Sequence, residues 1–317
     1  MKKAPDFNST LKDELREYVD FMVGNGRSFR VEITILKEFD RFLQANEVHE
    51  INAHCVDTFV RIKPTLTDGQ YEKRHRIIRK FLDYRAIRGK GESVPVPPKA
   101  RSSGRRIPYL YTESDITRIL SAAGELKPAD SLRPHTFQTI IGLLICTGLR
   151  ISEALNLDIE DLDLDNDVLY IRNTKFKKSR YVPIHPTTRT ALVRYAEHRT
   201  KHFPNAKSSA FFVSLRGRAI SYPTYNTTFL ELVRGLDIGG DGRNSRTHDL
   251  RHTFAVNRLL AWYEEGANVH DMLQILSTYM GHAHFEDTTY YLNASAELMA
   301  KGASAFTFNG RGGGKDA

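Results

Sequence analysis

Apolar residues recur at helical spacing in four successive segments of the first ninety residues, and this pattern predicts a small all-helical unit. In the first segment the apolar positions follow a period of three to four residues and end at a Gly-Asn-Gly turn. These positions are Leu11, Leu15, Tyr18, Val19 and Met22. The other three helices are predicted over residues 29–46, 56–62 and 71–88.

Most of the remaining chain is also periodic in the helical sense, with one short interruption of strand character. Helices are predicted over residues 135–146, 151–157, 187–202, 225–236, 247–264 and 269–279. Another begins at Thr112, which forms a capping-box-like start with Asp115. Residues 168–172 and 180–184 are typical of strands joined by the basic loop NTKFKKS, and residues 163–166 resemble a turn. Because strand–helix alternation is absent from the pattern, we predict a mainly α fold with a small β insert.

A stretch rich in Gly, Pro, Ser and positive charge separates the two periodic regions and predicts a linker. A chain of 317 residues is long enough for two domains of ordinary size. We therefore expect a helical domain at 1–90, a basic linker at 91–108, a second domain at 109–305 and a flexible, Gly-rich tail at 306–317.

The positive charge of the chain is concentrated in its first third. The formal net charge is +8, and residues 1–106 hold 22 Lys and Arg against 15 Asp and Glu. Residues 73–106 alone hold 12 basic and 2 acidic residues. Such a stripe favours a polyanion, most often nucleic acid, although a solvated helix face followed by a linker would give the same count. The candidate DNA-binding cations here are Lys73, Arg74, Arg76, Arg79, Lys80, Arg105 and Arg106.

Membrane insertion and secretion are not indicated by the sequence. No apolar run approaches the roughly 18–20 residues of a membrane span, and the N-terminus lacks the apolar core of a signal peptide. The only cysteines, Cys55 and Cys146, fall in apolar-periodic segments, so we expect reduced core thiols in a cytoplasmic protein.

Four separate segments carry candidate chemistry, and each has an ordinary explanation when taken alone. They are TGLRISEAL (147–155), NTKFKKSRYVPI (173–184), THDLRHTFA (247–255) and MGHAHFEDTTYYLN (280–293). Arg150 and Glu153 could simply form an ion pair within a helix. His248 and His252 could bind a metal, but a zincin motif needs Glu where Asp249 stands, so no metal site is expected.

Taken together, these segments supply what a phosphodiester transition state requires. Arginine forks neutralise the charge that develops on the non-bridging oxygens, and lysine and histidine can donate or accept protons. A tyrosine hydroxyl can act as the nucleophile of a covalent intermediate. Fixed cationic side chains would take the place of a metal ion.

The order of these motifs resembles that of the tyrosine recombinase (phage integrase-like) family. An Arg is followed by Glu three positions later, then come a hairpin Lys, H-x-x-R-H, G-H, and a Tyr nine residues after that His. The resemblance covers nearly all of residues 109–295. It implies a helical core-binding (SAM-like) domain followed by a mostly helical α+β catalytic domain.

The resemblance also implies a role for each motif residue. Arg150 and Arg251 would clamp the scissile phosphate, and Glu153 would orient the turn that carries Arg150. Lys175 would protonate the leaving 5′ oxygen; Lys177 is the alternative if the loop pairs differently, and together with Lys178 it could contact phosphates.

The histidines and tyrosines have implied roles as well. His248 would act as a base and phosphate contact, His282 would hydrogen-bond the scissile phosphate, and His252 would support its helix. Tyr291 is the implied nucleophile, with Tyr290 beside it as the alternative.

These roles imply a site-specific recombinase of a mobile element, either an integrase or a transposon recombinase. It would cut and rejoin DNA through a 3′-phosphotyrosyl intermediate and a Holliday junction, without ATP, metal or cofactor. Its partners would be double-stranded DNA with specific sites, other subunits of a homotetramer docked through residues 294–305, and accessory DNA-bending proteins. Two alternatives are type IB topoisomerase-like relaxation and a non-catalytic DNA-binding regulator.

Overall fold

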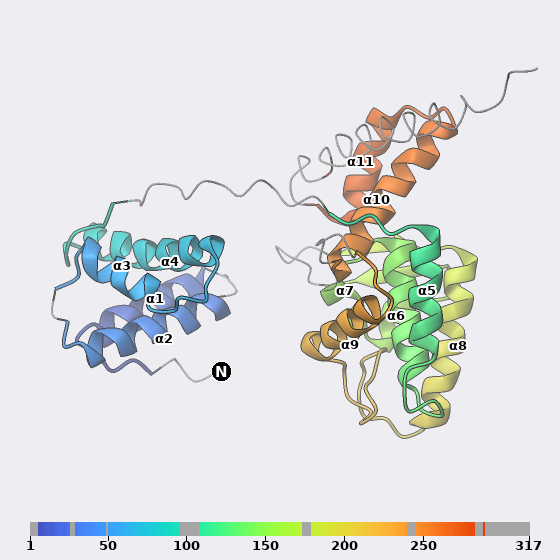
Figure 1. The fold of residues 1–317 in the computed structure, drawn as a ribbon, viewed down its shortest axis with the longest axis horizontal. Helices are drawn as coiled ribbons and strands as arrows, with labels where there is room; N and C mark the ends of the chain where they lie inside the picture. Colours follow the sequence, from blue (N-terminus) through green and yellow to red (C-terminus); the bar gives the residue numbers. More distant parts are fainter. Residues whose placement is uncertain are drawn as a thin grey trace, which may run out of the picture. The chain divides into compact units, whose positions relative to one another are not determined.

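The chain divides into two units in the computed structural model, Met1–Arg106 and Ile107–Ala317 (Figure 1), and each has a large hydrophobic core of its own. The structure describes residues 6–25, 29–48, 50–95, 108–172, 179–239, 245–282 and 288. Among these residues, no helix has the length and apolar character needed to cross a membrane.

The described residues of the first unit form four helices, as predicted. They are α1 (Lys12–Gly24), α2 (Arg30–Ala45), α3 (Ala53–Arg61) and α4 (Asp68–Ile87). Their apolar faces meet in one core, in which Leu36, Phe39 and Ile78 have no exposed surface. The rings of Phe39 and Phe59 meet edge to face with centroids 4.9 Å apart, an arrangement that aromatic pairs prefer.

Arg74 lies inside this unit, so its prediction as an exposed cation of the basic stripe is wrong. It is only 5% exposed, and its Nη1 donates to Glu38 Oε2 at 2.5 Å while its guanidinium lies 4.4 Å from the centre of the Phe59 ring. The reason is the helical period: position 74 shares a face with the buried positions 77, 78 and 81 of α4. Lys73, Arg76 and Lys80 remain exposed, and Arg79 is half-buried.

The second unit is mainly helical and contains one small sheet, which confirms the predicted fold class. Its elements are α5 (Glu113–Gly124), α6 (Arg133–Thr147), α7 (Ile151–Leu155), a 3₁₀ turn (Ile159–Asp161), β1 (Leu162–Asp163), β2 (Val168–Ile171), β3 (Arg180–Pro183), α8 (Pro186–His202), α9 (Tyr222–Gly235), α10 (Thr247–Glu264) and α11 (Val269–Met280). Helix α6 is central and packs against α5, α7, α8 and α10 (Figure 1). Its buried residues lie on several faces, as expected for a helix enclosed by others.

The sheet is antiparallel, in the order β1-β2-β3. Leu169 pairs with Val182 on the buried face, and Tyr170 pairs with Tyr181 on the other. The two longer strands confirm the predicted hairpin. The short strand β1 was not predicted, because two residues are too few to show alternation.

Local signals fix several helix ends. The predicted capping box of α5 is confirmed: Thr112 Oγ1 accepts from Asp115 N at 3.1 Å, and Asp115 Oδ2 accepts from Thr112 N at 3.0 Å. Helix α9 starts three residues before the predicted Tyr225, because Ser221 caps it and a proline occupies its first turn.

The two cysteines differ in environment. Cys55 is buried as predicted, whereas Cys146 is exposed, so its prediction as a core thiol is wrong. Cys146 lies near the end of α6, on a side of the helix that the core does not cover.

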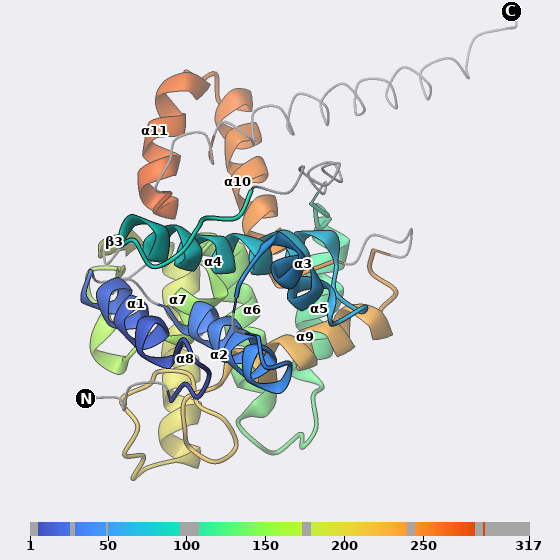
Figure 2. The same ribbon diagram turned by 90° about the vertical axis from the view of Figure 1, so that its left-hand side faces the viewer.

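Helices α10 and α11 form a neighbouring pair with a small core of its own (Figures 1 and 2). Residues at the start of α10 are buried, and α10 also packs on α6, while α11 contacts β3. Helix α6 therefore packs against this pair, of which α11 is one member. Both α6 and α11 end at glycines in left-handed conformations, Gly148 with φ 60° and Gly281 with φ 67°.

Two glycines of α6 are expected to respond to alanine in opposite directions. At Gly148 a Cβ atom would lie 2.4 Å from Phe254 Cδ1 in addition to the strain of a positive φ, so Gly148→Ala should destabilise the second unit by about 2 kcal/mol or more. At Gly142, inside the helix, the nearest atom to a new Cβ is Leu120 Cδ2 at 3.9 Å, so Gly142→Ala should stabilise it by about 0.5–1 kcal/mol. Urea unfolding followed by circular dichroism measures both. Equal effects of the two substitutions would contradict this assignment of the α6 terminus.

Candidate functional site

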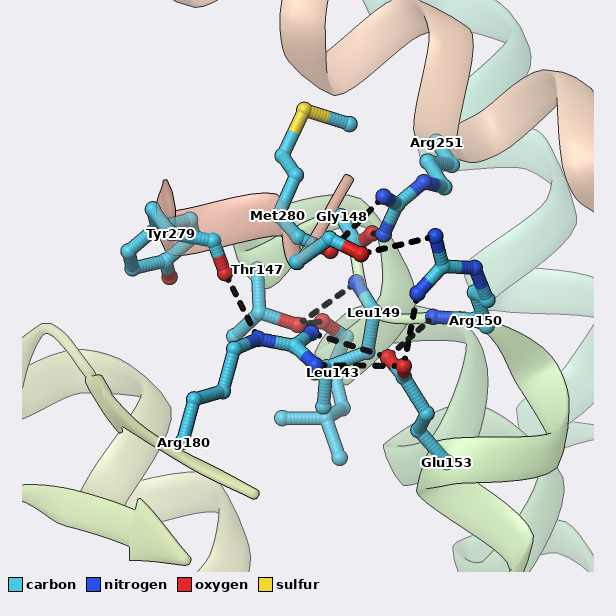
Figure 3. A network of polar contacts seen from close by, with 11 residues as sticks. Leu143, Thr147, Gly148, Leu149, Arg150, Glu153, Arg180, Arg251, Tyr279 and Met280 are labelled. Carbon is cyan, nitrogen blue, oxygen red and sulfur yellow. Dashed lines mark hydrogen bonds and ion pairs between the residues drawn. The ribbon is translucent and has the colours of Figure 1, made fainter. Parts of the chain in front are cut away.

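The candidate site is built on the carboxyl ends of α6 and α11. The last carbonyl groups of a helix have no donor within the helix and carry the negative end of its dipole, so cationic side chains are favoured there. At Gly148 and Gly281 the chain turns sharply away and leaves these carbonyl oxygens accessible. Three arginines from different elements donate to them (Figure 3).

Arg251 joins the two helix ends directly. It lies on α10, and its Nη1 donates to Gly148 O at 2.5 Å while its Nη2 donates to Met280 O at 2.8 Å. The residue is only 2% exposed. A guanidinium stays charged in a protein, so its burial requires acceptors, which the two helix ends supply.

Arg150 stands at the start of α7, one turn after the end of α6. Its Nη2 donates to Gly281 O at 3.0 Å, and its Nη1 donates to Glu153 Oε1 at 2.9 Å. The backbone N–H of Arg150 also donates to Glu153 Oε2, at 3.0 Å. The contact between Arg150 and Glu153 that was expected from their spacing is thus present. The same guanidinium also hydrogen-bonds the end of α11.

Arg180 is a third member of the cluster that the sequence reasoning missed. From the start of β3 it donates through Nε to Tyr279 O at 2.8 Å, and through Nη1 and Nη2 to the two oxygens of Glu153 at 3.1 and 2.9 Å. A signal was available, since Arg180 is on the same face of the strand as the buried Val182 and a charge on that face needs a partner.

The cluster carries more positive than negative charge. Glu153 is 8% exposed; burial alone raises its pKa, but hydrogen bonds and charge from Arg180, together with Arg150, outweigh burial and lower the pKa below its ordinary value. Three guanidiniums therefore face one carboxylate within this cluster. The balance of two positive charges suits an anionic group.

The histidines His248 and His282 adjoin the arginines and are held neutral. Burial, followed by the charges of Arg251 and Arg150, lowers the pKa of His282 to about 3. The pKa of His248 is lowered by the same causes, against an opposing effect of Asp249. His252, expected to support its helix, lies half-buried with its ring perpendicular to that of His248 and the centroids 4.9 Å apart.

Thr288 is another residue that the sequence reasoning did not single out. It has no exposed surface, and its Oγ1 lies 2.7 Å from Nδ1 of His282. A partner on Nδ1 orients the ring and turns Nε2 to the opposite side. No periodicity or motif signal in the sequence indicates this contact.

Several predicted site residues lie outside the described residues. They are Arg105, Arg106, Lys175, Lys177, Lys178, Tyr290 and Tyr291. The ends of β2 and β3 flank the segment of Lys175, and Tyr291 follows Thr288 by three positions. In the described part of the chain, no group of three His, Cys, Asp or Glu side chains could hold a metal ion.

Tyr279 is the described tyrosine whose main chain touches the cluster, and its environment disfavours a nucleophilic role. Its hydroxyl donates to Pro183 O at 3.2 Å, and burial raises its pKa to about 12. A phenol so far from ionisation is a poor nucleophile at neutral pH.

Removing the charge of Glu153 should destabilise the second unit in a pH-dependent manner. Because Glu153→Gln leaves two partly buried arginines without their buried carboxylate, we expect a loss of about 3 kcal/mol at pH 7. The lowered pKa of Glu153 means that its contribution is complete above the ordinary value of 4.5 and is lost as the pH falls through the lower, folded-state pKa. The gap between wild type and variant should therefore shrink towards pH 3 in urea unfolding curves.

Glu160→Gln is the matched control, since Glu160 is 85% exposed and lies 3.8 Å from Arg172. It should change stability little at either pH. A gap for Glu153→Gln that is constant between pH 7 and pH 3 would contradict the charge balance described here.

The chain is similar to several known proteins. The model of the phage integrase family matches residues 110–297. The protein y4rE of Sinorhizobium fredii, whose name describes it as an integrase/recombinase, is 35% identical over 96% of this chain and 98% of its own length. Tyrosine recombinase XerD of Caulobacter vibrioides is 27% identical over 80% of this chain and 81% of its own.

A solved structure shares the fold at low sequence identity. The Tn1549 transposon integrase in complex with transposon right-end DNA has a TM-score of 0.64 at 18% identity, covering 91% of this chain and 98% of that chain. Fold, motif order and sequence similarity over almost the whole length lead to one conclusion. The chain belongs to the phage integrase family, the tyrosine recombinases, which are enzymes that cleave and rejoin DNA.

Proposed function

We propose that the chain is a site-specific recombinase of a mobile element and that Arg150 and Arg251 clamp the phosphate it cleaves. The observation that carries the proposal is that both arginines donate to main-chain oxygens at the end of α11, Arg150 to Gly281 O and Arg251 to Met280 O, with His282 immediately after that end. These main-chain acceptors orient both guanidiniums in advance, which favours their stabilising the charge of a pentacovalent phosphorus. Glu153 and Arg180 hold that arrangement in place.

In the proposed reaction the oxygen of Tyr291 attacks the phosphorus and the bond to the 5′ oxygen breaks. The tyrosine proton passes to His248, which is neutral and can accept it, and Lys175 gives a proton to the departing 5′ oxygen. His282 donates a hydrogen bond from Nε2 to the phosphate, because Thr288 occupies Nδ1. The 3′-phosphotyrosyl bond conserves the energy of the phosphodiester, so a second 5′ hydroxyl can reseal the strand without ATP.

The proposed substrate is double-stranded DNA with specific recombination sites. In this proposal residues 1–90 form the core-binding domain, residues 91–108 a basic linker and residues 109–305 the catalytic domain, with residues 306–317 as a tail. Strand exchange through a Holliday junction would take place in a homotetramer joined through residues 294–305, assisted by DNA-bending proteins. The name of y4rE, and the likeness of fold to an integrase from a transposon, support a mobile element as the source of the sites.

Replacing the proposed nucleophile should abolish the covalent intermediate while leaving DNA binding intact. On a nicked suicide substrate, wild type should accumulate a protein–DNA adduct that resists denaturing electrophoresis, and Tyr291→Phe should form none, because a phenylalanine ring has no oxygen to attack phosphorus. Tyr290→Phe is the control and should still form the adduct. Loss of the adduct in Tyr290→Phe but not in Tyr291→Phe would place the nucleophile at the neighbouring position.

Charge on the exposed side of α4 should govern the salt dependence of binding. Replacing Lys73, Arg76 and Lys80 by Met should weaken DNA binding and reduce the slope of log K against log salt by about 0.9 for each phosphate that the variant no longer neutralises. Fluorescence anisotropy with duplex DNA at several salt concentrations measures the slope.

Arg74→Met removes one positive charge from the interior of the unit. It should lower stability, because Glu38 loses a close partner, and leave the slope of the folded protein unchanged. A slope that falls for Arg74→Met and not for the triple variant would overturn the assignment of the binding face.

A further inference from the structure

The second unit contains a pocket of about 450 Å³ that is separate from the arginine cluster. It lies between α6 and α8, with Leu120 of α5 at one edge. None of Arg150, Glu153, Arg180 and Arg251 lines it. Its volume is in the range of pockets that bind small molecules, roughly 300–1,000 Å³.

Two facing helical stripes form the walls of this pocket, which we name the α6–α8 pocket. The residues that line it from α6 are His135, Gln138, Thr139, Gly142, Leu143 and Cys146, and those from α8 are Thr187, Thr188, Ala191, Leu192, Arg194, Tyr195 and His198. Both sets follow the helical period of three to four residues, so one side of each helix faces the space. Leu143, Leu192 and Tyr195 are buried and give the pocket an apolar floor.

Small residues keep the space open. A glycine inside a helix costs up to about 1 kcal/mol relative to alanine, so Gly142 weakens α6. A Cβ atom there would touch only Leu120, at 3.9 Å, so close packing does not require the glycine. Gly142 and Ala191, on opposite walls, leave room that larger side chains would fill.

The polar groups of the pocket include the cation Arg194 and several hydrogen-bond donors. Arg194 is exposed one helical turn before His198, and in the described part of the chain it forms no ion pair. The rings of His135 and His198 stack with centroids 3.7 Å apart and planes 14° apart. No Asp or Glu lines the pocket. An anionic ligand therefore meets attraction and no opposing carboxylate from the walls.

The stacked histidines also favour an anion. Burial, followed by the charges of His198 and His202, lowers the pKa of His135. His202 lies on α8 next to the pair, with its Nδ1 2.8 Å from His198 O and its Nε2 3.2 Å from Asp130 O. An anion beside the stack would stabilise a protonated His135.

We infer that the α6–α8 pocket binds a small organic anion, a carboxylate or phosphate ester attached to an apolar body. The body would lie on the floor of Leu143, Leu192 and Tyr195, in the space left by Gly142. The anionic group would lie between Arg194 and the stacked histidines. This site is independent of the proposed strand-exchange chemistry, because it shares no residue with the arginine cluster.

The test uses 2-naphthoate as the probe and the full-length chain. Titration should saturate in calorimetry and should move the imidazole resonances of His135 and His198 in NMR spectra. The neutral analogue 2-naphthol and acetate, which lacks the apolar body, should each bind at least tenfold more weakly.

Two variants and one control locate the site. Arg194→Met should weaken naphthoate binding about tenfold, whereas Lys201→Met, which removes a charge from an exposed position of the same helix outside the pocket, should leave it unchanged. Gly142→Leu should abolish binding by filling the space, with circular dichroism to check that the helices are retained. Since Arg194 is exposed, its variant tests the site even if the leucine variant does not fold.

The inference is overturned if naphthoate fails to saturate, or if it binds without moving the two histidine resonances. It is equally overturned if Arg194→Met and Lys201→Met weaken binding alike, which would indicate general attraction to positive charge. Equal binding of 2-naphthol and 2-naphthoate would show that no anion is recognised.

Discussion

The hydrogen bonds from arginine side chains to the carbonyl ends of α6 and α11 are the interaction on which the rest of the site depends. A guanidinium cannot shed its charge when buried, so it must be given acceptors, and a helix end offers several that the helix itself leaves unused. Arg251 takes one from each helix, which fixes the two ends relative to each other. The glycines at both ends are the conformational condition for this, since each chain reversal needs a positive φ.

The second constraint is that the arginine cluster holds fewer negative than positive charges. Glu153 neutralises one of the three guanidiniums and at the same time orients two of them, so the cluster is rigid without being electrically balanced. Burial, followed by the charges of Arg251 and Arg150, lowers the pKa of the neighbouring His248 and His282 and keeps both neutral. Preorganised positive charge beside neutral proton carriers is what a phosphoryl transfer without a metal ion requires.

The helices, their caps and part of the arginine cluster could be predicted from the sequence, because their signals are local. Helical periods placed α10 and α11 to within a residue, and Thr112 with Asp115 marked the start of α5, because caps and amphipathic faces are properties of short segments. The ordered motifs identified Arg150, Glu153 and Arg251 before any geometry was known. The sequence indicated at most that Arg180 needs a partner, because its contacts with Glu153 and Tyr279 join residues far apart in the chain, and no local signal indicated the contact of Thr288 with His282.

The errors have the same origin. Arg74 was grouped with exposed cations by composition, although its position on the helix places it with the apolar residues. Cys146 was grouped with the core by its apolar neighbours, although the side of α6 that carries it is not covered. In both cases the prediction followed residue type, whereas the side of the helix on which the residue lies determines its exposure.

The most direct test is a crystal structure of the full-length chain bound to duplex DNA that carries its cleavage site. It would measure the distances from the guanidinium nitrogens of Arg150 and Arg251 to the non-bridging oxygens of the nearest phosphate. The account predicts that both arginines lie within about 2.7–3.2 Å of oxygens on one and the same phosphorus. Contacts of the two arginines to different phosphates, or to none, would contradict it.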